Sequence, residues 1–279
     1  MSGARAWAAL AAAVVLGVAG VRGRPAAAEP AGTTIEPRTP AGRTVTQVDS
    51  RGPALLGRSL TNENKDRYVL KRSVGTMTLT APTTNVGGNS RVVVAPVGEA
   101  PAADEEACAT WTIQSDPLNQ AGIALRVRAT GGGRRSAVTV TKNVWSGAGW
   151  LFNVHVWNSR RTPAFTQIAQ FDLSSAFRRR SGSPGPWRMC ARVVGSRVNF
   201  SAWPLDVPRP AAADPRHGGA VRLPPGYDGP GLAGLFVGHL RPGDSVGFTH
   251  VVMNAVDPGP SFGPGAPGPR EPAALASIS

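Results

Sequence analysis

The side chains with the most binding chemistry in this sequence alternate with apolar residues along short β-rich segments. Arginine and asparagine supply directional donors for hydroxyl and carboxylate groups, and tryptophan can stack on a sugar ring or a cation. Alternation along a strand would place these side chains on the face opposite the core. The candidates for a ligand-binding face are Gln114, Arg126, Arg128, Asn153, His155, Trp157, Arg192 and Asn199.

A second interpretation of the same residues is purely structural. The core of a sandwich can take up the seven tryptophans of this chain, and arginines on a strand are ordinary on a hydrated sheet face. The sequence leaves both interpretations open.

No residue has the pattern of a catalytic group. Glycoside hydrolysis ordinarily needs two positioned carboxylates, and neither Glu-x-Asp-x-x-Glu nor Glu-x-Asp-x-Glu occurs. A polysaccharide lyase would need a tyrosine or histidine base, but Gln167-Ile168-Ala169-Gln170 has alanine where that histidine would stand. Enzymatic activity is therefore uncertain, and the sequence leans against it.

The histidines and acids do not have the spacing of a metal site. His155, His217, His239 and His250 are far apart in sequence, and no H-x-H or H-E-x-x-H occurs. A structural calcium would need several oxygen ligands, and the sequence offers mainly isolated aspartates. We expect neither a metal nor a cofactor.

The two cysteines, Cys108 and Cys190, are expected to form one disulfide. Two cysteines alone cannot build a thiolate zinc site, and neither belongs to a C-x-x-C motif. Alternation puts both on the non-core face of their strands, as a bridge between sheet strands requires.

The elements that would position these residues are strands. Short alternating or apolar segments separated by Gly, Pro, Asn and Ser predict an all-β sandwich or barrel. The expected strands span 68–72, 75–80, 91–95, 108–114, 122–129, 137–144, 150–157, 165–171, 187–194, 197–203, 232–238 and 245–255, with a helical turn within 174–180.

One hairpin can be assigned in register. Gly195-Ser196 forms a two-residue turn between two β-rich runs, so facing residues have numbers that sum to 391. This register pairs Val193 with Val198 on an apolar face and Arg192 with Asn199 on the other.

The ends of the chain differ from its middle. A charged start, an apolar run of about 15 residues and an Ala-x-Ala end predict a signal peptide over residues 1–28. Residues 29–60 are expected to be an extended leader and 61–256 a β-sandwich domain. The Pro/Gly-rich tail 257–279 cannot bury enough apolar surface to fold.

The chain is strongly basic, with a formal charge of +13 that becomes +10 without the signal peptide. Such a charge favours anionic partners. The only dense run is Arg178-Arg179-Arg180, and an exported protein meets envelope polymers first, so we do not expect nucleic acid as the partner. No transmembrane segment is expected after signal removal, and the oligomeric state stays open.

Three segments taken in order resemble the concanavalin A-like lectin/glucanase superfamily in its laminin G-like form. They are 119–126 with its Gly-hydrophobic-x-hydrophobic-Arg pattern, the hairpin 187–203 between two tryptophans, and the closing strands 231–238 and 243–253. The resemblance implies a jelly roll of two packed antiparallel sheets, whose concave face or loop rim often holds sugars in relatives.

The resemblance does not imply one activity, because this fold hosts lectins, glycan-binding modules, glycosidases, lyases and adhesive domains. The leading hypothesis is an exported, non-catalytic module that binds a cell-envelope or extracellular glycan, acidic or neutral. The alternatives are a glycan-active enzyme, hydrolase or lyase, with a non-standard site, and a structural or interaction domain without a sugar site.

Overall fold

The structure is a computed structural model that describes residues 55–61, 68–83, 91–114, 120–131, 135–143, 149–177, 186–211 and 214–255. The expected signal peptide, most of the expected leader, the C-terminal tail and the Arg178–Arg180 run lie outside these residues. Among the residues that are described, no helix has the length and hydropathy needed to cross a membrane.

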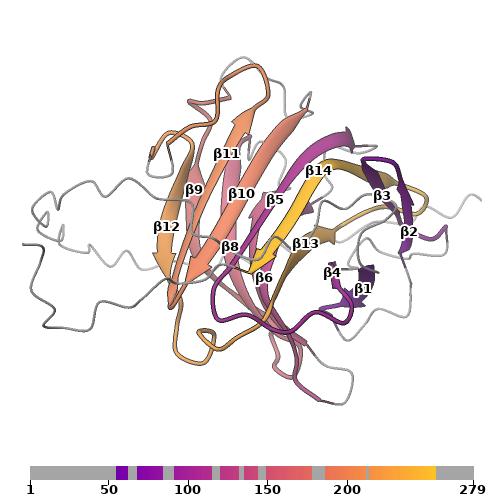
Figure 1. Cartoon of the computed structure of the whole chain (residues 1–279), viewed down its shortest axis with the longest axis vertical. Helices are drawn as coiled ribbons and strands as arrows, with labels where there is room; N and C mark the ends of the chain where they lie inside the picture. Colours follow the sequence, from indigo (N-terminus) through magenta and orange to yellow (C-terminus); the bar gives the residue numbers. More distant parts are fainter. Residues whose placement is uncertain are drawn as a thin grey trace, which may run out of the picture. The chain divides into compact units, whose positions relative to one another are not determined.

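Two antiparallel sheets of seven strands each build the domain (Figure 1). Sheet A has the order β12 (Gly218–Arg222), β11 (Arg197–Pro204), β10 (Trp187–Val194), β5 (Glu105–Gln114), β14 (Ser245–Ala255), β3 (Thr76–Thr80) and β2 (Val69–Ser73). Sheet B has the order β1 (Leu55–Ser59), β4 (Arg91–Pro96), β13 (Leu232–Gly238), β6 (Gln120–Ala129), β7 (Arg135–Lys142), β8 (Leu151–Asn158) and β9 (Phe165–Asp172). This architecture confirms the predicted all-β, two-sheet antiparallel sandwich.

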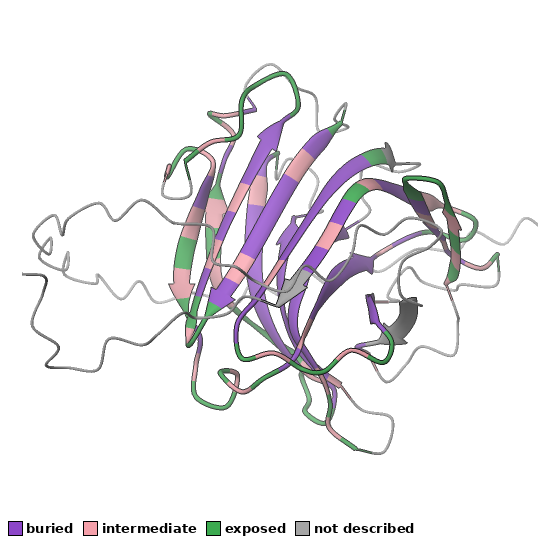
Figure 2. Ribbon diagram, viewed as in Figure 1, coloured by how far each residue is buried: buried purple, intermediate pink, exposed green. Residues whose placement is uncertain are grey.

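The main core lies between the inner faces of the two sheets. Burial runs along the central strands of both sheets (Figure 2). Trp111 of β5 stacks on Trp187 of β10 with ring centroids 4.3 Å apart, and Phe248 of β14 meets Trp111 edge to face. These aromatic rings bury large apolar areas and join three strands of sheet A to the inner face of sheet B.

The hairpin β10–β11 has the predicted register. Val194 faces Arg197, Val193 faces Val198, and Arg192 faces Asn199. Val193 and Val198 are fully buried in the main core. The alternation of apolar and polar residues specifies this register because a slip by one residue would exchange the two faces.

Two strands were not predicted from the sequence. Strand β1, which pairs with β4, falls in the segment expected to be an extended leader. Strand β12 contains Gly218 and Gly219, a composition that disfavours strands. Glycine is required at both positions because neighbouring atoms leave no room for a side chain. A Cβ on Gly218 would collide with the carbonyl of Phe200, and one on Gly219 with the ring of Phe171.

A β-bulge in β6 changes which side chains point inward. The pairing of β6 with β7 shifts between Leu125 and Arg128, and Arg126 has a φ of 54°. Alternation predicted Arg126 on the non-core face, but its side chain is 0% exposed. The prediction is wrong because the extra residue reverses the alternation after Leu125.

Candidate binding site

The structure distributes the predicted site residues over several places. Asn153, His155 and Trp157 lie on the outer face of sheet B, whereas Arg192 and Asn199 lie on the outer face of sheet A. Arg126 is buried, Arg128 lines a cavity at one end of the sandwich, and the side chain of Gln114 lies outside the described residues. The fold therefore does not bring these residues together in one site.

The three candidates on β8 are enclosed. Trp157 is 2% exposed, its Nε1 donates to Thr139 Oγ1 at 2.9 Å, and its ring packs against Phe165 and Phe236. The ring faces of Trp157 therefore contact protein. The sequence placed this tryptophan on a binding face, but in the structure it packs in a second apolar cluster.

Asn153 and His155 are enclosed in the same way. Asn153 Oδ1 accepts a hydrogen bond from Gln170 Nε2 at 2.8 Å. Burial, and then the positive charge of Arg91, lower the pKa of His155 to about 4, so the imidazole is neutral at physiological pH. We name these three residues, with Thr139 and Gln170, the β8 cluster.

Arg126 belongs to a buried charge cluster between the sheets. Its Nη1 lies 3.7 Å from Glu105 Oε1 and its Nη2 lies 3.9 Å from Asp104 Oδ1. Its guanidinium donates to the carbonyls of Ala102 and Gly195 at 3.2 and 2.9 Å. These contacts compensate a cation that is withdrawn from solvent.

Glu105 is the partner that burial perturbs most. Desolvation raises the pKa of its carboxyl to about 7, although the amide of Arg126 and the charges of Arg126 and Arg128 act in the opposite direction. A raised carboxyl pKa is also typical of general acids. Glu105 is only 1% exposed and does not line the cavity described below, so it has no access to a substrate there.

A cavity of about 320 Å³, here called the end cavity, opens at the end of the sandwich where β6, β7 and β8 meet the loop after β12. Arg128 Nη2 donates to the carbonyl of Gly226 at 2.8 Å and ties β6 to this loop. The described lining contains two arginines and no carboxylate, and consists of Arg128, Ala129, Thr130, Ser136, Asn158, Arg161, Pro225, Gly226 and Tyr227.

Two buried hydroxyls in this lining have no partner among the residues that the structure describes. Within the described part of the chain, neither Thr130 Oγ1 nor Ser136 Oγ has a hydrogen-bond partner, and Ser136 is only 5% exposed. A buried hydroxyl without a partner is costly, so such groups point to a bound polar molecule or an ordered water.

Sequence reasoning found one member of the end cavity, Arg128, and missed the others. Tyr227 lies in a Pro-Pro-Gly-Tyr-Asp-Gly loop and Arg161 in the turn after β8, where no periodicity marks a side chain as functional. The available signal was the turn composition around one of only two tyrosines in the chain.

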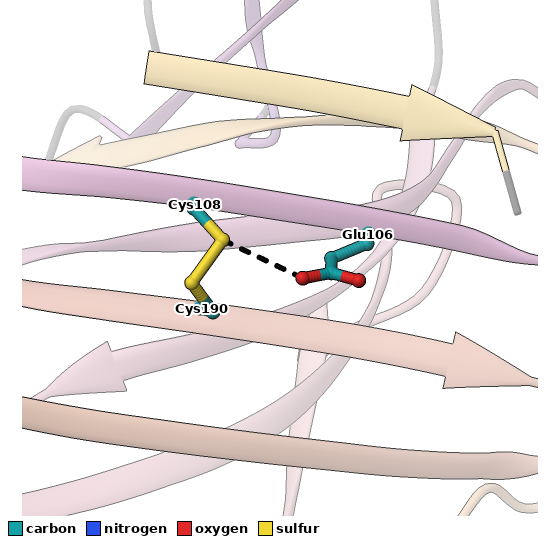
Figure 3. Close-up of side chains that lie close together, drawn as sticks. All are labelled: Glu106, Cys108 and Cys190. Carbon is teal, nitrogen blue, oxygen red and sulfur yellow. Dashed lines mark hydrogen bonds between the residues drawn. A yellow bond between two sulfur atoms is a disulfide. The ribbon is translucent and has the colours of Figure 1, made fainter. Parts of the chain in front are cut away.

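The predicted disulfide is confirmed. Cys108 of β5 and Cys190 of β10 face each other in the register of sheet A and are bonded. Glu106 lies beside them, with Oε1 3.6 Å from Cys108 Sγ (Figure 3). Although these three residues cluster as metal ligands would, bonded sulfurs are not thiolates, so the oxidised protein lacks the donors of a zinc site here.

No protein-family model and no curated protein matches the chain. Among solved structures, the chain is similar to a carbohydrate-binding module, CBM66, from Bacillus subtilis, with 11% identity over 71% of this chain and 94% of that one and a TM-score of 0.44. It is also similar to a protein of unknown function with a galectin-like fold from Bacillus subtilis, with 12% identity, coverage of 72% and 89% and a TM-score of 0.44.

A legume lectin-like domain from Entamoeba histolytica is similar at 6% identity, with coverage of 76% of this chain and 98% of that one and a TM-score of 0.46. All three chains differ greatly from this one in sequence. At such identities the side chains of the sites need not correspond.

Proposed function

We propose that this chain is an exported, non-catalytic module that binds a saccharide in the end cavity, and that the bound sugar carries a negative charge. The observation that carries the proposal is the pair of hydroxyls without a partner among the described residues, Thr130 and Ser136, in a cavity that also holds two arginines and a tyrosine. The cavity volume of about 320 Å³ is at the lower end of the range typical of small-ligand sites.

Each part of the lining suits one part of an acidic sugar. The hydroxyls of Thr130 and Ser136 can both donate to and accept from sugar hydroxyls. The guanidinium groups of Arg128 and Arg161 can pair with a carboxylate. The ring of Tyr227 offers an apolar surface for the face of the pyranose.

Two features support export, one in the structure and one in the sequence. The disulfide between Cys108 and Cys190 is present in the structure, and such bonds persist mainly outside the reducing cytosol. Residues 1–28 have the composition of a signal peptide. We therefore propose an extracellular or envelope-associated protein.

Screening the purified chain on an array of acidic and neutral oligosaccharides, followed by calorimetric titration of the best ligand, tests the binding proposal. We expect Tyr227→Ala and Arg161→Ala to weaken binding about tenfold each, as expected for the loss of one good contact. Arg241→Ala, which removes an exposed arginine outside the cavity lining, is the matched control.

Two results would contradict the proposal. One is the absence of any retained saccharide for the wild-type chain. The other is a ligand whose affinity is unchanged in both cavity variants, which would place its site elsewhere.

A further inference from the structure

The outer face of sheet A carries a concentration of arginines that the end cavity does not use. The register places Arg197 beside Arg222 and Arg192 beside Asn199. Arg188 precedes Arg192 on β10, and the bridged Cys190 lies between them on the same face. A fifth arginine comes from the loop after β11. We name this surface the arginine face and define it by Arg188, Arg192, Arg197, Arg209 and Arg222.

The arginine face has one acid among the described outward residues of β5, β10, β11 and β12. This is Glu106, which faces Arg192 across the ladder and lies 3.8 Å from Arg209. On these strand positions and Arg209, five arginines thus stand against one carboxylate. Such a surface attracts counter-ions or an anionic partner.

Arg188 is held in place rather than free in solvent. Arg188 Nη1 donates to Thr110 Oγ1 and to the carbonyl of His250 at 3.0 and 3.1 Å. Burial, and then the neighbouring charge of Arg209, lower the pKa of Arg188. Side chains that are already positioned lose less entropy when an anion binds.

One donor on the face has no partner. Within the described residues, the buried Nε of Arg192 makes no hydrogen bond. Beside it, Asn199 accepts from Arg197 Nε at 3.5 Å and keeps its amide nitrogen as a donor. The face thus combines charge with groups that suit hydroxyls.

Among its described residues, the arginine face lacks the exposed aromatic side chains expected for single-stranded nucleic acid. Single-stranded nucleic acid is usually bound on exposed aromatic side chains, but Trp203, the aromatic residue among the described outward positions of β5, β10, β11 and β12, is 4% exposed with Arg209 above its ring. Arginines and amides can bind a chain of carboxylated sugars without any aromatic surface for stacking.

We propose that the arginine face binds a linear acidic polysaccharide through its carboxylates, independently of the end cavity. Successive outward residues on a strand are about 6.7 Å apart and neighbouring strands about 4.8 Å apart, so the arginines form rows that a flexible polyanion can follow. The face would retain the protein on an acidic polymer even when the cavity is empty.

Binding of the full chain to immobilised polygalacturonate, with dextran as the neutral reference, tests this proposal. We expect the triple variant Arg192→Ala/Arg197→Ala/Arg222→Ala to bind at least about tenfold more weakly. The triple variant Lys71→Ala/Arg160→Ala/Arg241→Ala removes the same charge from exposed positions outside β10, β11 and β12 and is expected to bind within about twofold of wild type.

Two further variants distinguish the arginine face from the end cavity as the place where the polymer binds. Glu106→Gln removes the acid of the face and releases Arg209, so it is expected to bind polygalacturonate about threefold more tightly. Arg128→Ala/Arg161→Ala removes the two cavity arginines and should weaken polymer binding clearly less than the arginine-face triple does, because the end cavity can hold only a small part of the polymer. Because Glu106→Gln predicts a gain, misfolding cannot imitate its expected result.

Three outcomes would overturn the proposal. Equal losses in the two charge-removal triples would show that net charge alone is responsible. Loss of polymer binding only in the cavity variant would assign the polymer to the end cavity. Tighter binding to single-stranded DNA than to polygalacturonate at equal charge would assign the face to nucleic acid.

Discussion

The end cavity and the β8 cluster contain similar side chains in opposite situations. In the β8 cluster, Trp157 donates to Thr139 and Gln170 donates to Asn153, and the rings are packed against one another. His155 Nδ1 has no partner among the described residues, but the packed rings enclose it. In the end cavity, Thr130 and Ser136 have no partner among the described residues and line an open volume. The comparison shows that residue type does not decide whether a polar or aromatic side chain is available to a ligand.

The difference arises from what covers each surface. The outward side chains on the central strands of sheet B, including Val93, Ala124 and Phe236, are as buried as those of the main core. A strand of this sheet can therefore be buried on both faces although polar and apolar residues alternate along its sequence. The loops at the end of the sandwich leave polar groups accessible without any periodic pattern.

The largest effect that separates the two regions should come from Trp157→Ala. Truncating this 2% exposed ring leaves a cavity among Phe165 and Phe236, so the free energy of unfolding should fall by about 3–5 kcal/mol. Chemical denaturation measures the change. Unchanged stability would show that the β8 cluster is not packed as described.

The next effect is the pH dependence contributed by His155. Its pKa is about 4 in the folded protein and 6.5 in the unfolded chain, so stability is fully present above pH 6.5 and is lost as the pH falls toward 4. The loss should reach about 3 kcal/mol at most.

Comparing wild type with His155→Gln isolates this term. The raised pKa of Glu105, about 7, acts in the opposite direction, because its contribution is present below pH 4.5 and is lost as the pH rises through 7. Because Glu105 is present in both proteins, its contribution cancels in the comparison. The free energy of unfolding of wild type, relative to that of His155→Gln, should therefore decrease as the pH falls below 6.5. A constant difference from pH 4 to 8 would indicate that His155 is not enclosed.

In the end cavity the balance between stability and affinity should reverse. Tyr227→Ala removes a half-buried loop ring that packs against the edge of the main core, so the free energy of unfolding should fall by no more than about 2 kcal/mol while affinity for an acidic oligosaccharide falls about tenfold. Melting curves and calorimetric titration of one preparation measure both quantities. A larger loss of stability with full affinity would show that Tyr227 serves packing alone.

The smallest effect, and the sharpest, concerns Ser136. Because its hydroxyl has no partner among the described residues, Ser136→Ala should leave the free energy of unfolding within about 0.5 kcal/mol of wild type or raise it. Affinity for the sugar should fall about threefold. Destabilisation by more than about 1 kcal/mol would reveal an internal partner for this hydroxyl.

Short-range patterns predicted much of the fold and little of the site. The turn Gly195-Ser196 and the alternation on either side specify the β10–β11 register, and the same alternation put Cys108 and Cys190 on one face. The bulge at Arg126 escaped prediction because it depends on how β6 pairs with β7 and β13. Of the end cavity only Arg128 was found, since the loop of Tyr227 is brought to β6 by tertiary contacts.

The disulfide described above also determines which parts of the chain stay joined after a cut. Cys108 and Cys190 are separated by 82 residues, and the segment between them contains β6, β7, β8 and β9, four strands that are successive neighbours in sheet B. A protease that cleaves a loop within this segment would produce two fragments that remain linked until a reductant is added. In an environment rich in secreted proteases, the protein could thus be nicked between these strands without releasing either half of the sandwich.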